Sequence, residues 1–181
     1  NFRNILWGWK TFGKVSLKDD GPFERNPHYV RLAYAGHPHK QTGLDNEGFF
    51  GIGIKKRRRV SFLCMGTCGR RGKHPLKIRV ELADTKSMNE QQAFVAADVT
   101  VDSKEWKKYQ VILKPEVTNP KAILRIFLAS RQTVDLEHIS LFPVDTWQGH
   151  ENGLRKDLVQ ALADIKPGVF RFPRRMYCRR Y

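Results

Sequence analysis

The sequence predicts a mainly β chain, an antiparallel β-sandwich of the jelly-roll type, followed by the beginning of an α/β segment. Short stretches with apolar residues at alternate positions recur up to Pro143, with turns and no helical pattern between them. After Pro143 the period changes, and Leu154, Leu158 and Ile165 stand at helical spacing. A chain of 181 residues has room for one ordinary domain and part of a second.

The strand predictions follow this alternation along the chain. The predicted strands are residues 9–17, 28–35, 49–54, 76–82, 93–101, 106–113, 122–129 and 134–141. In the last of them the alternation slips near Glu137 and His138, which indicates a β-bulge. A polar loop is expected between the second and third strands. The aromatic residues expected in the core of the sandwich are Phe49, Phe50 and Phe127.

One helix is predicted after the strands. It begins at Asn152 or Gly153 and ends at Pro167, and a short apolar run at 169–172 follows it as in an αβ unit. One helix and one strand cannot complete an α/β domain. We therefore expect a sandwich over residues 1–143 and the start of a truncated second domain over residues 144–181.

Composition narrows the class of protein. A hydrophobic content of 40% and a charged content of 28% are globular values, and no apolar run approaches the roughly 20 residues that span a bilayer. The chain opens abruptly and without a signal-peptide pattern, so we expect it to be a piece of a longer protein. Cys64 and Cys68, with His74, match half of a zinc site, but no second cysteine pair follows; free thiols are favoured.

The net charge of +15 raises the hypothesis of nucleic-acid binding. The cations are unevenly placed, because ten of them stand within residues 57–73 and 174–180. The two stretches show no regular interleaving of aromatic residues with the cations, and no nucleic-acid-binding motif is present. A basic nucleic-acid binder is therefore the less favoured alternative.

Several motifs carry a resemblance to known proteins. EWKKYQVIL (105–113) and VDLEHISLFP (134–143) resemble the closing half of a carbohydrate-binding module of the family 4/9 type, a jelly roll with a galactose-binding-like fold. NPHYVRLAYAG, NEGFFGIGIKK, NGLRKDL, LADIKP and FRFP are similar to the family 51 glycoside hydrolases, the α-L-arabinofuranosidases. In that family such a module precedes the first helix of a (β/α)8 barrel. The resemblance implies that residues 144–181 are the first helix and strand of the barrel.

The resemblance also implies a function for the parent protein. It would be a secreted or periplasmic enzyme that hydrolyses terminal α-L-arabinofuranosides in hemicellulose or pectin, with two glutamates about 5 Å apart on later barrel strands. The glutamates of this chain match no catalytic motif and are expected at the surface or in turns: Glu24, Glu47, Glu81, Glu105 and Glu137. We expect no hydrolase activity from the fragment, only sugar binding or a purely structural role. Its expected partners are an arabinofuranose-containing polysaccharide and the rest of the barrel, and no membrane.

Sugar binding needs aromatic faces that stack on rings and polar groups that bind hydroxyls. The candidates are Trp7, Trp9, Tyr34, His37, His39, Asp45 and Trp106, with Gln41 beside them. The alternative is that the aromatic residues pack in the core and that His37 and His39 lie in a solvated loop rather than at a metal. No cofactor is predicted; related modules often carry a structural calcium, but no dense acidic loop marks one here.

Two segments, residues 57–74 and 174–181, depart from the family pattern in the same way. Shifting the reading frame by one base allows RRRVSF to become GEEYRF and residues 63–67 to become SVWAR, while residues 174–176 become GGC. The hypothesis is that both segments are frame-shifted readings, and an unbroken frame in the source DNA would exclude it. As the chain stands, we expect residues 57–74 to bring charge where a core strand should be, at a cost of several kcal/mol.

Overall fold

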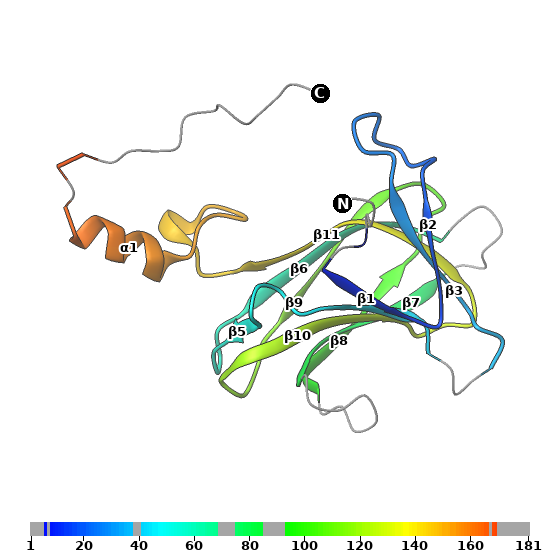
Figure 1. Ribbon diagram of the computed structural model, residues 1–181, viewed down its shortest axis with the longest axis horizontal. Helices are drawn as coiled ribbons and strands as arrows, with labels where there is room; N and C mark the ends of the chain where they lie inside the picture. The colour runs from blue at the N-terminus through cyan, green and yellow to red at the C-terminus, as the bar shows by residue number, and fades with distance from the viewer. Residues whose placement is uncertain are drawn as a thin grey trace.

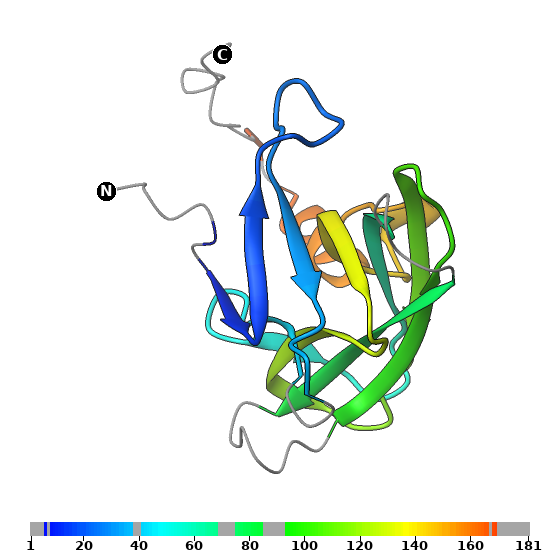
Figure 2. The ribbon, with the colours of Figure 1, turned by 90° about the vertical axis from the view of Figure 1, so that its right-hand side faces the viewer.

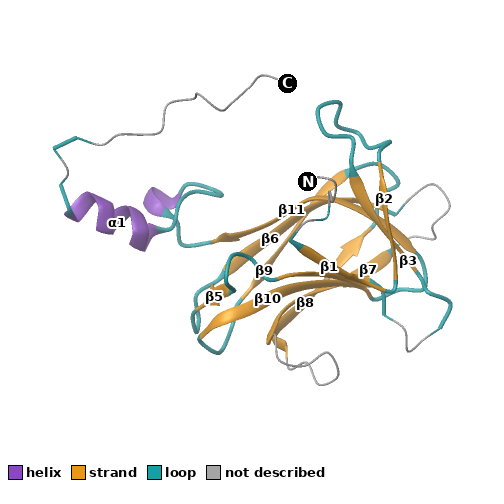
Figure 3. Cartoon of the chain, viewed as in Figure 1, coloured by secondary structure: helices purple, strands orange, loops and turns teal. Residues whose placement is uncertain are grey.

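The computed structural model describes residues 6, 8–37, 41–68, 75–84, 93–166 and 168–169. Within them two antiparallel sheets face each other as a sandwich (Figures 1 and 3). The six-stranded sheet has the order β1-β4-β10-β7-β8, with β5 paired to β10, and the five-stranded sheet has the order β2-β3-β11-β6-β9. The predicted mainly β sandwich is confirmed.

Each sheet collects strands from the whole length of the chain. The six-stranded sheet contains β1 (Trp9–Phe12), β4 (Gly43–Asn46), β5 (Ile52–Ile54), β7 (Leu76–Asp84), β8 (Ala93–Val101) and β10 (Asn119–Leu128). The five-stranded sheet contains β2 (Lys14–Lys18), β3 (Tyr29–Ala33), β6 (Val60–Thr67), β9 (Lys107–Leu113) and β11 (Thr133–Pro143). Apart from β2–β3 and β7–β8, the neighbouring strands are distant in sequence, so the fold depends mainly on non-local pairing.

The core lies between the two sheets and is filled from alternate strand positions. The side chains that are at most 1% exposed include Leu32, Leu44, Phe62, Leu76, Ile78, Leu82, Leu113, Ile126, Val134 and Leu136. The residues between them in sequence point to the two outer faces of the sandwich. The core is shared by both sheets, so a binding site that belongs to one sheet alone must lie on that sheet's outer face.

The predicted strand over residues 9–17 is divided by Gly13. This glycine has a φ of +71°, and a Cβ there would lie 2.3 Å from the Gln41 carbonyl oxygen. The chain turns at this point and leaves β1 in one sheet for β2 in the other (Figure 2, blue). A residue with a side chain would be strained in this conformation.

Other expectations need correction. In the described part of residues 57–74, which is 57–68, no charge enters the core, because Arg57, Arg58 and Arg59 are exposed before β6 begins and Phe62 points inward. The predicted polar loop contains β4. Phe49 and Phe50 are 87% and 97% exposed rather than buried, since they form the tip of a tight turn with positive φ at Gly48, Phe50 and Gly51. Phe127 is half-buried.

The predicted bulge is confirmed. The pairing of β11 with β6 shifts register between Glu137 and Ser140, and His138 has a φ of +47°. The bulge reverses the alternation, so that Glu137 and Ser140 both lie on the outer face. It is the reason why a strand of 11 residues keeps one apolar face.

The segment after β11 extends beyond the sandwich (Figure 1). It forms a 3-10 turn, Trp147–Gly149, and the helix α1, Lys156–Asp164, which contains no buried residue. The exposed apolar residues of this segment are Leu154, Leu158, Leu162, Ile165 and Val169. The expected domain boundary near residue 143 stays a prediction, and residues 170–172 lie outside the described part of the chain. No described helix has the length and apolarity to cross a membrane.

Candidate functional site

The outer face of the five-stranded sheet holds the most promising group of polar and aromatic side chains. Register places Arg31 of β3 opposite Asp135 of β11, and Glu137 of β11 opposite Met65 of β6. Their sequence neighbours point into the core, so these side chains point outward. Trp106 stands just before β9 on the same face.

An aromatic pair spans this face. The rings of Tyr29 and Trp106 meet edge to face, with centroids 5.2 Å apart and planes at 76°. Tyr29 belongs to β3 and Trp106 precedes β9, so the rings meet across the two strands between them. The pair fixes the orientation of Trp106, which remains half-exposed.

A charged network supports Tyr29. Its hydroxyl donates to Asp20 at 2.9 Å and accepts from Arg31 Nη2 at 3.1 Å. Arg31 in turn donates to both carboxylate oxygens of Asp135, at 2.7 and 2.8 Å. Burial and the bond to Asp20 raise the pKa of Tyr29 to about 12, and the bonds to Asp135 raise the pKa of Arg31. The phenol stays neutral and the guanidinium stays charged over the physiological range.

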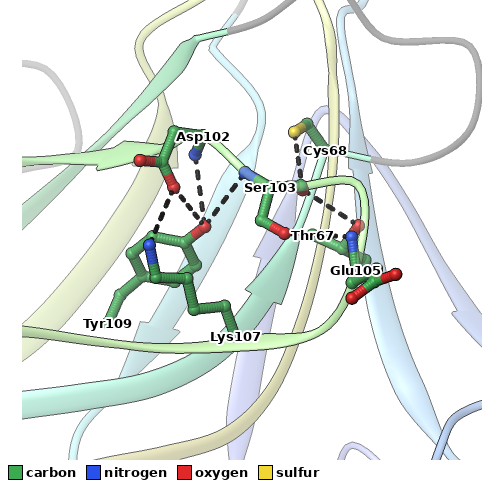
Figure 4. A network of polar contacts seen from close by, with 7 residues as sticks. All are labelled: Thr67, Cys68, Asp102, Ser103, Glu105, Lys107 and Tyr109. Atoms are coloured by element: carbon green, nitrogen blue, oxygen red, sulfur yellow. Dashed lines mark hydrogen bonds and ion pairs between the residues drawn. The ribbon is translucent and has the colours of Figure 1, made fainter.

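A network of polar contacts fixes the loop before β9, which leads into Trp106 (Figure 4). Tyr109 donates its hydroxyl hydrogen to Asp102 at 3.0 Å and accepts from the backbone N–H groups of Asp102 and Ser103 at 3.2 Å. Thr67 of β6 donates to the Lys104 carbonyl at 2.8 Å. These bonds join the loop to both neighbouring strands, so that Trp106 is presented by a fixed backbone.

Glu137 is the exception in this network. Only 6% of the residue is exposed, and its Oε2 atom has no hydrogen-bond partner among the described residues. Its Oε1 atom has two long contacts, to Asn26 Nδ2 at 3.5 Å and His138 Nδ1 at 3.4 Å. Burial raises the pKa of Glu137 above its ordinary value of 4.5. The expectation that Glu137 lies at the surface is therefore wrong, as it is for Glu81, which is 9% exposed.

An open pocket of about 300 Å³ lies on the same face, beside Glu137. The residues that line it are Phe23, Leu63, Cys64, Met65, Lys108, His138, Ser140, Phe142 and Asn152. Phe23 comes from the loop between β2 and β3, and Asn152 from the segment before α1. Mostly apolar walls with a few polar groups at the edge are typical of small-ligand sites.

Of the predicted sugar-binding residues that the structure describes, it brings Trp106 alone to this face. Trp9 and Tyr34 pack against the core. Asp45 lies on the outer face of the other sheet in an ion pair with Arg125. His37 is exposed in a loop, and Trp7 and His39 lie outside the described residues. Among the described residues, no group of three or more metal-ligating side chains comes together.

Sequence reasoning missed Tyr29, Arg31, Asp135 and Glu137. A signal was present, because the alternation in 28–35 and 134–141 separates an apolar face from a face with these four residues. Their pairing across two distant strands was not visible in that pattern.

The curated relatives of this chain are α-L-arabinofuranosidases. α-L-Arabinofuranosidase 1 of Arabidopsis thaliana is 28% identical over 96% of this chain and 26% of its own length. The extracellular exo-α-L-arabinofuranosidase of Streptomyces chartreusis is 29% identical over 93% of this chain and 19% of its own length. The chain thus spans about a quarter or less of these relatives. No family model matches it.

Solved structures agree in fold. An arabinose-bound family 51 α-L-arabinofuranosidase superposes with a TM-score of 0.77 at 20% identity, over 93% of this chain and 28% of that one. A xylan-binding domain from Paenibacillus barcinonensis gives 0.52 at 13% identity, over 76% of this chain and 92% of that domain. Over nearly its whole length the chain is thus similar to one segment of α-L-arabinofuranosidases, and it shares the fold of the corresponding part of a family 51 enzyme.

Proposed function

We propose that this chain is the carbohydrate-binding module of an α-L-arabinofuranosidase, joined to the first helix of its catalytic barrel. The parent protein would release terminal α-L-arabinofuranosyl groups from hemicellulose or pectin, with the catalytic glutamates beyond this segment. The arabinofuranosidase relatives over nearly the whole chain support this proposal. The relative named as extracellular supports a secreted parent.

The observation that carries sugar binding is the outer face of the five-stranded sheet. Trp106 provides a half-exposed aromatic surface, and the pocket on the same face has mostly apolar walls that include the polar side chains of Lys108, His138 and Ser140. A sugar ring presents an apolar face and several hydroxyls, and therefore matches such a surface. The ligand would be a neutral polysaccharide chain that carries arabinofuranose.

Retention on arabinoxylan or arabinan gels tests this proposal. Trp106→Ala should weaken retention about tenfold, because it removes the stacking surface. Phe127→Ala is the matched control, since Phe127 is also half-buried but belongs to the six-stranded sheet. Equal retention of the two variants, or no retention of the unchanged chain, would contradict the proposal.

The same chain can be tested against the nucleic-acid alternative. Arg57, Arg58 and Arg59 are exposed, and Arg58 already pairs with Asp145. Binding of random DNA that falls steeply with salt, together with no retention on the gels, would favour that alternative.

A scaffold role is the second candidate, and the exposed apolar residues favour it. Phe49 and Phe50 project from one turn, and α1 exposes Leu158 and Leu162. In the parent these surfaces would pack against the barrel. Phe49→Ser with Phe50→Ser should leave the stability of this chain unchanged and lower that of the full-length parent; an unchanged parent would argue against the scaffold.

A further inference from the structure

Among the described residues no donor reaches the Oε2 atom of Glu137, a residue of β11 that β6 runs beside. Its partner in register on β6 is Met65, and a thioether cannot donate a hydrogen bond. The carboxylate is more than nine-tenths buried, and its Oε2 atom is unpartnered among the described residues. Buried polar groups in native proteins are nearly always paired. Position 65 is therefore where a donor is expected and missing.

The frame-shift hypothesis makes a definite statement about this position. Methionine has the single codon ATG and every glycine codon begins with GG, so a one-base shift across Met65 and Gly66 reads TGG, tryptophan. Across Cys64 and Met65 the same shift reads GTA or GCA, valine or alanine. The tryptophan does not depend on the choice of codon, and the Cys64 codon decides only between valine and alanine, both of them small and apolar.

The residues that the shifted frame gives at positions 64 and 65 both suit the face of β6 on which each position lies. Position 64 faces the core, where Cys64 is 2% exposed and a small apolar residue fits. Position 65 faces outward, beside Glu137 and in the wall of the pocket. An indole there brings an N–H donor to the carboxylate and a flat aromatic face to the pocket.

We propose that position 65 completes the sugar site of the native module: a tryptophan there donates to Glu137 and stacks on a neutral sugar ring in the pocket. The proposal rests on the proposed function, because it places the bound sugar ring on the same face of the sheet as Trp106. It assigns Glu137 a positioning role, since the carboxylate holds the indole rather than the sugar.

The experiment restores the donor in the present chain. Met65→Trp should raise the melting temperature by about 2–6 °C relative to Met65→Phe, which has an aromatic ring without a donor. Met65→Gln against Met65→Leu repeats the comparison at nearly the original size, in case the indole does not fit. Each gain should disappear when Glu137→Gln is added, because the coupling requires the carboxylate.

Sugar binding is measured on the same variants. Met65→Trp should tighten retention on arabinoxylan about tenfold, and Met65→Gln should not. If neither Met65→Trp nor Met65→Gln gains stability through Glu137, the proposal is overturned, whatever the binding. If no variant binds sugar while the stability gains are seen, the proposed function fails and the pairing of position 65 with Glu137 stands. Retention that is tightened equally by Met65→Phe would overturn the positioning role of Glu137.

Discussion

Both outer faces of the sandwich carry arginine–carboxylate pairs, but the two faces differ in how completely their carboxylates are paired. On the six-stranded sheet Arg125 donates to both oxygens of Asp45, at 2.7 and 2.5 Å, with side-chain exposures of 5% and 8%. Arg79 bridges Glu81 at 2.7 Å and Asp98 at 3.2 Å. On the five-stranded sheet Arg31 and Asp135 form a similar pair, but one oxygen of Glu137 beside them has no partner in the part of the chain that the structure describes.

The two faces differ in the hydrogen-bonding groups and aromatic surface that remain free to bind a ligand. Where each of these charges has its partner, the polar groups stabilise the sheet and offer no free bonding capacity. The five-stranded sheet keeps a buried carboxylate with one oxygen unpartnered among the described residues, a half-exposed tryptophan and an open pocket on one face. A buried polar atom without a hydrogen-bond partner, next to an open pocket, is more typical of a ligand-binding site than of a purely structural surface.

The largest expected effect comes from removing the buried ion pair on the outer face of the six-stranded sheet. Arg125→Met leaves Asp45 charged, buried and unpaired, and should lower the free energy of unfolding by about 3–5 kcal/mol. Denaturant titration measures this loss. Arg125→Met combined with Asp45→Leu should recover most of it, because both charges are then removed. A single-variant loss below about 1 kcal/mol would mean that the pair is hydrated and that the two faces do not differ as described.

A matched pair of glutamates sharpens the comparison. Glu81→Gln should cost about 1–2 kcal/mol, since it weakens the charge-assisted bond from Arg79. Glu137→Gln should instead stabilise the protein at pH 7, by up to about 1 kcal/mol, because it removes a buried charge without a full set of partners.

The pH dependence follows from the raised pKa of Glu137. A folded-state pKa above the unfolded value means that the native state holds its proton more tightly, so this stabilisation is complete below the unfolded pKa. It is lost as the pH rises through the folded-state pKa. The advantage of Glu137→Gln should therefore vanish below about pH 4. An advantage that is equal at pH 4 and pH 7 would show that charge is not the cause.

The smallest expected effect concerns α1. Leu158→Ser with Leu162→Ser should change the free energy of unfolding of this chain by less than about 0.5 kcal/mol, since both side chains are exposed. Thermal unfolding measures it. A loss of several kcal/mol would show that α1 covers one of the two outer faces, and the comparison between them would then have to be redrawn.

Much of the fold could be predicted from the sequence, because alternation reports burial directly. β8 was predicted with its observed bounds, and the slip at Glu137 and His138 located the bulge. β4 was missed because its four residues, GLDN, are short and polar. Phe49 and Phe50 were placed wrongly because hydrophobicity alone does not show that Gly48 and Gly51 turn the chain outward.

The site was harder to predict because it depends on pairing between distant strands. Tyr29 and Trp106 are 77 positions apart in sequence and become neighbours only through the order β3-β11-β6-β9. The isolation of Glu137 depends on which residue of β6 stands opposite it. Composition pointed toward cations and nucleic acid, whereas the structure places the described arginines before β6 at the surface.

The central claim is that the five-stranded sheet carries the sugar site, and amide chemical shifts measured during titration with an arabinoxylan oligosaccharide test it most directly. We expect the Trp106 indole and the amides of β3, β9 and β11 near the pocket to shift together with one saturating dependence. The amides around Asp45 and Arg125 should stay in place. Shifts centred on Asp45 and Arg125, or none at saturating oligosaccharide, would contradict the account.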